Sequence, residues 1–128
     1  MILEVNVDKK GEGTFVVSSF GSIDSVTYRE LEKTLVPFLV STTNVIIFNM
    51  EGVSYISSMG ISVILKTKKA VEENGGSFIM TNLQPQIKAV FEVIKALPNM
   101  RVFESLKEAD EYLSQIQRKE IEKRGGSF

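Results

Sequence analysis

The sequence predicts a single α/β domain, in which helices pack against a mixed sheet of four or five strands. Three observations indicate this fold class. Two strand-like stretches open the chain, strand-like and helix-like apolar periodicities alternate after them, and one short run is apolar without interruption. An opening hairpin is antiparallel, whereas crossovers through helices join parallel strands, so we expect a mixed sheet.

The first two strands are expected at about residues 2–8 and 14–20. They flank Gly11-Glu12-Gly13, and this spacing is typical of a β-hairpin. We expect Gly21 to end the second strand, because glycine weakens strand interiors.

A helix is expected next, from about residue 27 to 39, because apolar side chains recur there on one face. Pro37 lies late in this stretch and is expected to disturb the last turn, since proline has no backbone N–H to donate. The predicted buried face consists of Leu31, Leu35 and Phe38.

The central strand is expected at residues 44–50, which contain the uninterrupted apolar run Val45-Ile46-Ile47-Phe48. A strand with no polar alternation is typical of one that is covered on both faces. A helix should follow from about Ser58 to Glu73. Asn74-Gly75-Gly76 is expected to end it, because these residues tolerate a left-handed cap.

The second half of the chain continues the alternation. A strand is expected at 77–81, and a helix that starts near Pro85, a residue suited to the first helical turn. The apolar stripe of this helix comprises Ile87, Val90, Phe91 and Ile94, and Leu97-Pro98 is expected to end it.

A short strand is expected at about 100–103, followed by a final helix. Ser105 to Glu108 has capping-box spacing, which marks a helix start. The predicted buried stripe of the final helix is Leu106, Ala109, Leu113 and Ile116. We therefore expect the folded domain to cover residues 1–116. Residues 117–128 should form a charged, solvated helical extension with a disordered tail from Gly125.

The composition excludes several function classes. There is no cysteine and no histidine, so thiolate metal sites, thiol nucleophiles and Ser-His-Asp triads are excluded. Fifteen basic and 16 acidic residues leave a net charge of −1, so the chain lacks the excess of positive charge that is typical of nucleic-acid-binding proteins. No apolar run approaches the roughly 20 residues of a membrane span, and the first residues lack a basic leader. We expect a cytoplasmic binding module without a cofactor rather than an enzyme.

The stretch 51–65 is the most informative part of the chain, because it leads from a buried strand into a helix that opens on serines. Either Ser57 or Ser58 can cap that helix, and a plain capping role for Ser58 is the alternative to a functional one. Glycine is a poor helix former by about 1 kcal/mol relative to alanine. Gly60 in the first turn therefore indicates a bare surface that another molecule approaches closely.

This stretch resembles the STAS domain of anti-sigma-factor antagonists, and the resemblance extends over about residues 1–116. The family signature here is Asp-Ser-x-Gly, in which the serine is phosphorylated. Anchored on Gly60, it places Ser58 on that serine, Met59 on the variable position and Ser57 on the aspartate. The chain departs from the family pattern at Ser57.

A second family element, Gly-x-Ile/Leu-Asp, is matched by Gly21-Ser22-Ile23-Asp24. The resemblance implies that Asp24 lies beside the phosphorylation site, although the bare sequence also allows it to be a turn residue that caps the helix from Thr27. A further departure is Asn49, which stands where the family's central strand often carries an aspartate.

The resemblance implies a function in partner switching. The unphosphorylated protein would bind an anti-sigma factor that is also a serine kinase, and so free a sigma factor. Phosphorylation of Ser58, or less favourably Ser57, would end this binding, and a PP2C-like phosphatase would restore it. The expected partner surface comprises Asp24, Ser57, Ser58, Met59 and Gly60, with neither nucleic acid nor membrane as a direct partner.

Two alternatives stay open at this point. The first is a STAS module that senses a ligand or serves as a scaffold without phosphorylation, which the loss of the acid at Ser57 favours. The second is an enzyme with Asp24 and Glu51 as acid and base. The sequence contains no paired-acid motif and no metal-ligand spacing that would support it.

Overall fold

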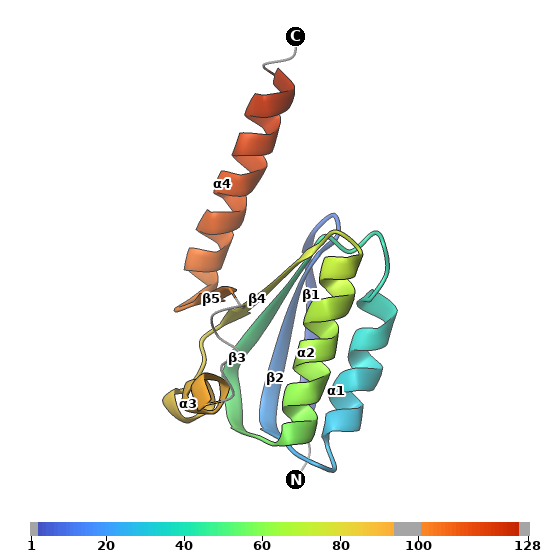
Figure 1. Ribbon diagram of the computed structural model, residues 1–128, viewed down its shortest axis with the longest axis vertical. Coiled ribbons are helices and arrows are strands. Elements are labelled where there is room, and N and C mark those ends of the chain that lie inside the picture. The colour runs from blue at the N-terminus through green and yellow to red at the C-terminus, as the bar shows by residue number, and fades with distance from the viewer. Residues whose placement is uncertain (1–2, 94–100, 126–128) are drawn as a thin grey trace.

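The computed structural model describes residues 3–93 and 101–125. Its core is one five-stranded sheet with the strand order β1-β2-β3-β4-β5 (Figure 1). β1 and β2 pair antiparallel, and each later neighbour pairs parallel, so the predicted mixed sheet with a central third strand is confirmed. The strands are β1 (Glu4–Gly11), β2 (Thr14–Ile23), β3 (Val45–Ile56), β4 (Ser77–Thr81) and β5 (Arg101–Phe103).

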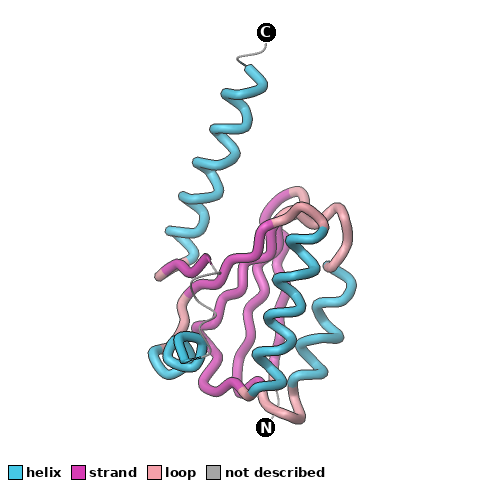
Figure 2. Tube along the Cα trace, in the orientation of Figure 1, coloured by secondary structure: helices cyan, strands magenta, loops and turns pink. Residues whose placement is uncertain are grey.

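Helices lie on both faces of this sheet. Helices α1, α2 and α3 cover one face, and α4 packs on part of the other, from which its ribbon projects beyond the sheet (Figures 1 and 2). The helices are α1 (Tyr28–Leu35), the 3-10 turn η1 (Val36–Phe38), α2 (Ser58–Glu73), α3 (Pro85–Val93) and α4 (Leu106–Gly125). Among the described residues, no helix is both long and apolar enough to cross a membrane.

The run Val45 to Phe48 is apolar throughout because β3 is covered on both faces. Ile46 and Phe48 belong to the main core under α1, α2 and α3. Val45 and Ile47 point the other way, into a smaller core with Ala109 of α4. All four are buried. Since side chains alternate between the faces of a strand, double cover removes the need for a polar position.

The two strands that lead to the candidate site are longer than predicted. β2 continues past Gly21 to Ile23, so the prediction that Gly21 ends it is wrong. Gly21 has a φ of 117°, and the pairing of β2 with β3 shifts between Gly21 and Ser22. Glycine accommodates this irregularity, because it adopts positive φ without steric cost. β3 likewise continues past residue 50, to Ile56.

The ends of α1 and α2 follow from local chemistry. α1 stops at Leu35, and Pro37 lies inside the 3-10 turn that replaces the expected last helical turn. Leu31 and Leu35 are buried, as predicted. α2 spans the predicted range Ser58–Glu73, and Gly75 behind it has a φ of 81°, the left-handed conformation expected of its terminator.

The helices and strands in the second half of the chain also agree with the prediction, as far as the structure describes them. α3 starts at Pro85, and Ile87 and Phe91 are buried. Ile94, the predicted stop at Leu97-Pro98 and the first residue of the predicted strand 100–103 lie outside the described residues.

At the start of α4, the Ser105 Oγ accepts from the Glu108 N–H at 3.2 Å, as in a capping box. The Glu108 carboxylate, however, accepts from the N–H of Glu104 and not of Ser105. Ala109 and Leu113 are buried, Leu106 is half-buried, and the side chain of Ile116 lies outside the described part. Gly125, where the disordered tail was expected to begin, still belongs to α4.

Candidate functional site

The start of α2 is capped by Ser57. This residue is extended, with φ −94° and ψ 173°, and its Oγ accepts a hydrogen bond from the N–H of Gly60 at 3.3 Å. Its carbonyl oxygen accepts from the N–H of Ile61 at 2.9 Å. Of the two serines that the sequence offered as caps, the structure therefore uses Ser57, which satisfies an otherwise unpaired N–H of the first turn.

Ser58 is the first residue of α2, and its side chain is exposed. Within the described residues its hydroxyl makes no hydrogen bond, so it has no part in the cap. The backbone N–H groups of Ser58 and Met59 are likewise unpaired within that part of the chain. A helix start with free N–H groups and a partial positive charge favours an anionic substituent.

Gly60 faces the protein core, so its interpretation as a bare surface for another molecule is wrong. The residue is buried. A Cβ at this position would lie 2.6 Å from Ile23 Cγ2, 2.8 Å from Ile56 Cγ1 and 2.9 Å from the Ile23 carbonyl oxygen. The close approach that requires a glycine is made by the ends of β2 and β3 in this same chain. Gly60 allows α2 to start against them.

Asp24 organises the turn between β2 and α1. Its Oδ1 accepts hydrogen bonds from the backbone N–H groups of Val26 at 2.9 Å and Thr27 at 2.8 Å, and it lies 3.1 Å from the Thr27 hydroxyl oxygen. The Thr27 Oγ1 accepts a hydrogen bond from the Asp24 N–H. It donates one to the carbonyl oxygen of Ser22 at 2.6 Å. Asp24 is thus a turn residue, as the alternative to a functional role proposed, but the N–H groups that it binds precede α1, whose N-cap is Thr27.

The same hydrogen bonds set the charge of Asp24. The backbone N–H groups of Thr27 and Val26 favour the ionised carboxylate and lower the pKa of Asp24 from its ordinary value of 3.8. Asp24 is therefore a fixed negative charge near neutral pH. Only one of its carboxylate oxygens takes part in these bonds, and the Asp24 side chain is partly exposed.

The structure places Asp24 and the serines at the same end of the sheet. β2 and β3 are parallel, with Ile23 opposite Ile56, so the residues that follow both strands emerge side by side. The N–H of Ser57 donates to the carbonyl oxygen of Ile23 at 2.8 Å, which joins the Asp24 turn to the start of α2.

Three exposed apolar side chains occur in the segments that meet at this end of the sheet. Val26 is 78% exposed, Tyr55 54% and Met59 41%. Val26 belongs to the Asp24 turn, and Tyr55 pairs with Ser22. Sequence reasoning selected only Met59, although Val26 and Tyr55 lie within two residues of positions that it did select.

A shallow groove of about 350 Å³ continues from Ser58 along α2. Its lining includes Ser62 and Leu65, and two lysines at its far end, Lys66 and Lys69. Two i,i+4 ion pairs lie on this helix: Lys68 is 2.6 Å from Glu72, and Lys69 is 4.0 Å from Glu73. The groove that starts at Ser58 is therefore lined mostly by the apolar surface of Ile61 and Leu65, and the lysines lie at its far end.

Three kinds of group therefore occur together at this end of the sheet. It offers a hydroxyl at a helix start, a nearby carboxylate held by a turn, and exposed apolar side chains. Among the described residues, no group of three or more His, Cys, Asp or Glu side chains could hold a metal ion.

The chain is similar to several known proteins. The family model described as the STAS domain matches residues 6–109. The anti-sigma-B factor antagonist of Bacillus subtilis (strain 168) is 32% identical over 92 residues, which cover 71% of this chain and 84% of the relative. The protein of the same name from Staphylococcus aureus (strain NCTC 8325 / PS 47) is 29% identical over 92 residues, or 71% of this chain and 85% of the relative.

The fold agrees with a solved structure of the same class. The Bacillus cell fate determinant SpoIIAA, in its phosphorylated form, superposes with a TM-score of 0.70 at 22% sequence identity. The superposition covers 86% of this chain and 99% of SpoIIAA.

Proposed function

This chain belongs to the STAS domain family, and we propose that it acts as an anti-sigma-factor antagonist. In this proposal the unphosphorylated protein binds an anti-sigma factor that is also a serine kinase, and the bound kinase can no longer hold its sigma factor. Phosphorylation of Ser58 ends the binding, and a PP2C-like phosphatase restores it. The names of the two relatives in the preceding comparison support the class of partner.

The observation that carries the proposal is the exposed Ser58 hydroxyl at the first position of α2. A kinase requires an accessible acceptor whose modification leaves the fold intact. Ser58 meets this requirement because its side chain makes no hydrogen bond with any described residue. Ser57 meets it poorly, because its Oγ caps the N–H of Gly60 and its side chain is half-buried.

Ser57 also explains how the chain keeps its helix start without the family aspartate. Serine and aspartate are both good N-cap residues, since each offers an oxygen to a first-turn N–H. The change to Ser57 therefore preserves the cap and removes one negative charge beside the acceptor. We expect the kinase of this protein to need no carboxylate at that position.

Phosphorylation changes the charge of the surface more than its shape. A phosphoserine adds about −1.5 to −2 charges and three acceptor oxygens. Asp24 already supplies a fixed negative charge at this end of the sheet. A partner carboxylate at about 5 Å would be repelled by on the order of 3 kcal/mol per charge at an effective dielectric near 20. Since about 1.4 kcal/mol is a tenfold change in affinity, this repulsion is sufficient for a switch.

The test is a pull-down from the native lysate with immobilised wild-type protein, Ser58→Ala and Ser58→Asp. We expect wild type and Ser58→Ala to capture the same kinase, and Ser58→Asp to capture less of it. After incubation with that kinase and ATP, mass spectrometry should locate phosphate on Ser58 and find none in Ser58→Ala. Ser57→Ala and Ser62→Ala are the matched controls, and both should still accept phosphate on Ser58.

A second candidate is a STAS module that binds a ligand or a protein without being phosphorylated. The observation that favours it is the missing acid at Ser57. It predicts a partner that binds wild type and Ser58→Asp equally and places no phosphate on either serine. Phosphate on Ser57 instead of Ser58 would support the switch but move its acceptor by one residue.

A further inference from the structure

The face of the sheet on which α4 packs is only half covered by the described residues. α4 lies over the first half of β2 and β3, where Val16, Val45 and Ile47 are buried in the smaller core. The second half of the same face, toward the carboxyl ends of these two strands, is exposed, and we call it the open surface. It consists of Glu4 and Asn6 of β1, Ser18 and Phe20 of β2, and Asn49 and Glu51 of β3.

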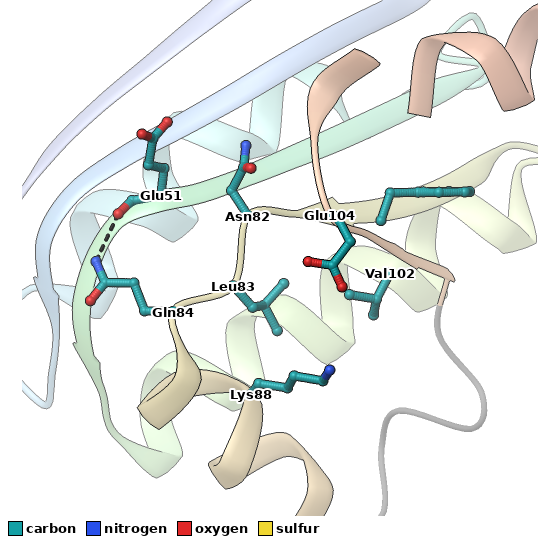
Figure 3. A pocket seen from close by; sticks show the side chains of 8 residues that line it. Glu51, Asn82, Leu83, Gln84, Lys88, Val102 and Glu104 are labelled. Carbon is teal, nitrogen blue, oxygen red and sulfur yellow. Dashed lines mark hydrogen bonds between the residues drawn. The ribbon is translucent and has the colours of Figure 1, made fainter. Parts of the chain in front are cut away.

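Strand alternation places three notable side chains on the open surface. Phe20 lies four residues after Val16 on β2, so both point to the α4 face of the sheet. Glu4 is the register partner of Phe20 and therefore shares its face. Figure 3 shows the carboxylate of Glu51, on β3, directed to this face and away from Lys88 of α3. The three side chains thus project from the same half of the sheet.

Phe20 is an exposed aromatic residue whose ring packs against the sheet. Its side chain is 44% exposed. A Cβ at Gly52, the register partner of Phe20 on β3, would lie 2.4 Å from Phe20 Cδ1, so the ring occupies the place of a side chain. One side of the ring therefore packs on the backbone, and the other side is open. A ring held in this way loses little conformational freedom when a partner covers it, and its face attracts cations.

Carboxylates flank this ring on both neighbouring strands. Glu4 lies directly opposite Phe20, and Glu51 precedes the glycine against which the ring packs. Both glutamates are exposed, and neither forms an ion pair with another described residue. The remaining members of the open surface are uncharged, so the surface carries two negative charges around one aromatic ring. Arginine and lysine side chains suit such a surface, because they pair with carboxylates and lie over aromatic faces.

The far end of α4 is a basic segment of matching size. α4 continues to Gly125, past its buried residues Ala109 and Leu113, and its ribbon projects beyond the sheet (Figures 1 and 2). Residues 118–124 comprise four basic residues, two acidic residues and one isoleucine, which gives a net charge of +2. Seven helical residues are about 10 Å long. This length is close to the width of a surface that spans three neighbouring strands.

The basic segment cannot reach the open surface of its own chain. α4 starts beside β5 and leaves the sheet at the end where β3 begins, whereas the open surface lies at the opposite end, where β1 begins (Figure 1). A second copy that is related by a twofold axis across the strands is inverted. Such an axis lays the basic segment of each copy over the open surface of the other. The contact is isologous and closes with two copies.

We propose that the open surface binds the basic segment 118–124 of a second copy of this chain, so that two copies form a twofold dimer with their α4 helices between the two sheets. The charges on the two sides of the contact are equal and opposite, and the Phe20 ring adds an aromatic face for a cationic side chain. Exposed ion pairs are individually weak, so we expect a reversible dimer that salt weakens. The inference is independent of the proposed switch.

The first test is sedimentation velocity of the full chain at several concentrations and ionic strengths. At low salt and chain concentrations on the order of 100 µM, we expect the mass to approach twice the 14.3 kDa of one chain. At about 1 M salt the Debye length is only about 3 Å, so the equilibrium should shift toward the monomer.

Two charge-reversal variants test the two sides of the contact. The surface variant carries Glu4→Lys and Glu51→Lys, and the segment variant carries Lys119→Glu and Lys123→Glu. Each variant alone brings like charges together and should self-associate at least about tenfold more weakly than wild type. Glu92→Lys, on the exposed side of α3, is the matched control and should associate as wild type does. Thermal unfolding checks that all variants are folded.

The decisive experiment mixes the two folded variants in equal amounts. In a mixed pair, the unchanged segment lies on the unchanged surface, and the reversed segment lies on the reversed surface. Both contacts of the twofold then join opposite charges, so we expect the mixture to recover the dimer that each variant alone has lost. A dimer that forms through any other surface would not show this recovery.

Three results would overturn the inference. One is a mass of a single chain for wild type at low salt and at the highest concentration. Another is a dimer that neither charge reversal weakens. The third is a mixture of the two folded variants that stays monomeric. All three leave the Ser58 switch untouched, because its readout is phosphate on Ser58 and capture of a kinase.

Discussion

The backbone N–H of Ser57 donates a 2.8 Å hydrogen bond to the carbonyl oxygen of Ile23. Through this bond, the residue that caps α2 is attached to the last residue of β2, and the Asp24 turn begins immediately after it. Ser58 and the Asp24 carboxylate therefore lie on elements that are fixed to each other. The following predictions test the contacts that build this end of the sheet.

Alanine substitutions should separate the roles of the two serines. Ser57→Ala removes the acceptor for the Gly60 N–H, and we expect it to lower the free energy of unfolding by about 1 kcal/mol. Ser58→Ala removes no hydrogen bond to a described residue and should change it by less than about 0.5 kcal/mol. Urea unfolding at neutral pH measures both. A larger loss for Ser58→Ala than for Ser57→Ala would reassign the cap.

Gly60→Ala should destabilise the domain, although alanine is the better helix former. The new Cβ would lie 2.6 Å from Ile23 Cγ2 and 2.9 Å from the Ile23 carbonyl oxygen, so α2 must move. Overpacking of this kind costs about 1–3 kcal/mol. The matched control is Gly11→Ala, because a Cβ there meets no atom within 4 Å. Thermal unfolding of both variants checks the expectation, which fails if Gly60→Ala is neutral.

Asp24 should make the stability of the domain depend on acid pH. Its pKa in the folded protein lies below its ordinary value of 3.8, because the N–H groups of Thr27 and Val26 favour the carboxylate. The stabilisation is therefore complete above pH 3.8 and is lost as the pH falls through the folded pKa. Asp24→Asn, which keeps an oxygen for the two N–H groups, should remove this contribution.

The measurement for Asp24 is an NMR titration of its carboxyl carbon, combined with urea unfolding of wild type and Asp24→Asn at several pH values. Asp8→Asn, on the exposed side of β1, controls for the loss of one negative charge. The stability gap between wild type and Asp24→Asn should narrow toward low pH. A gap that widens as the pH falls would show the sign to be wrong.

Thr27 and Thr34 offer a matched pair for the buried turn. The buried Thr27 Oγ1 donates to the Ser22 carbonyl oxygen and accepts from the Asp24 N–H. Thr27→Val leaves both groups unpaired and should cost about 1–3 kcal/mol. Thr34→Val removes a single bond, from Thr34 Oγ1 to the Glu30 carbonyl oxygen on an exposed helix face, and should cost less than about 1 kcal/mol. Equal costs in chemical denaturation would argue against a structural role for the turn.

Local pattern was sufficient to predict most of the fold. The apolar run from Val45 to Phe48 predicts a strand covered on both faces, and period-2 alternation distributes its side chains between two cores. Pro37 predicts the disturbed end of α1, and Asn74-Gly75-Gly76 the end of α2. These predictions hold because the causes, a missing N–H, a permitted positive φ and a hydrophobic period, act within a few residues.

At the candidate site, some predictions from the sequence agree with the structure and others do not. Sequence reasoning selected Ser58, Ser57 and Asp24, and it placed the start of α2 at Ser58. It gave the wrong environment to Gly60, because a glycine in a first turn is equally compatible with an open surface and with a crowded core. It also offered no way to choose between Ser57 and Ser58 as the cap, since both are serines in adjacent positions.

By itself, the sequence determined the order and type of the elements, the absence of thiol and imidazole chemistry, and the family. Tertiary structure alone decided which groups meet. The pairing of β2 with β3 brings Ile23 beside Ser57 and Gly60. The physical reason is that such contacts depend on strand register and on the side from which a helix packs. Both are set by the burial of the whole core and not by any short segment.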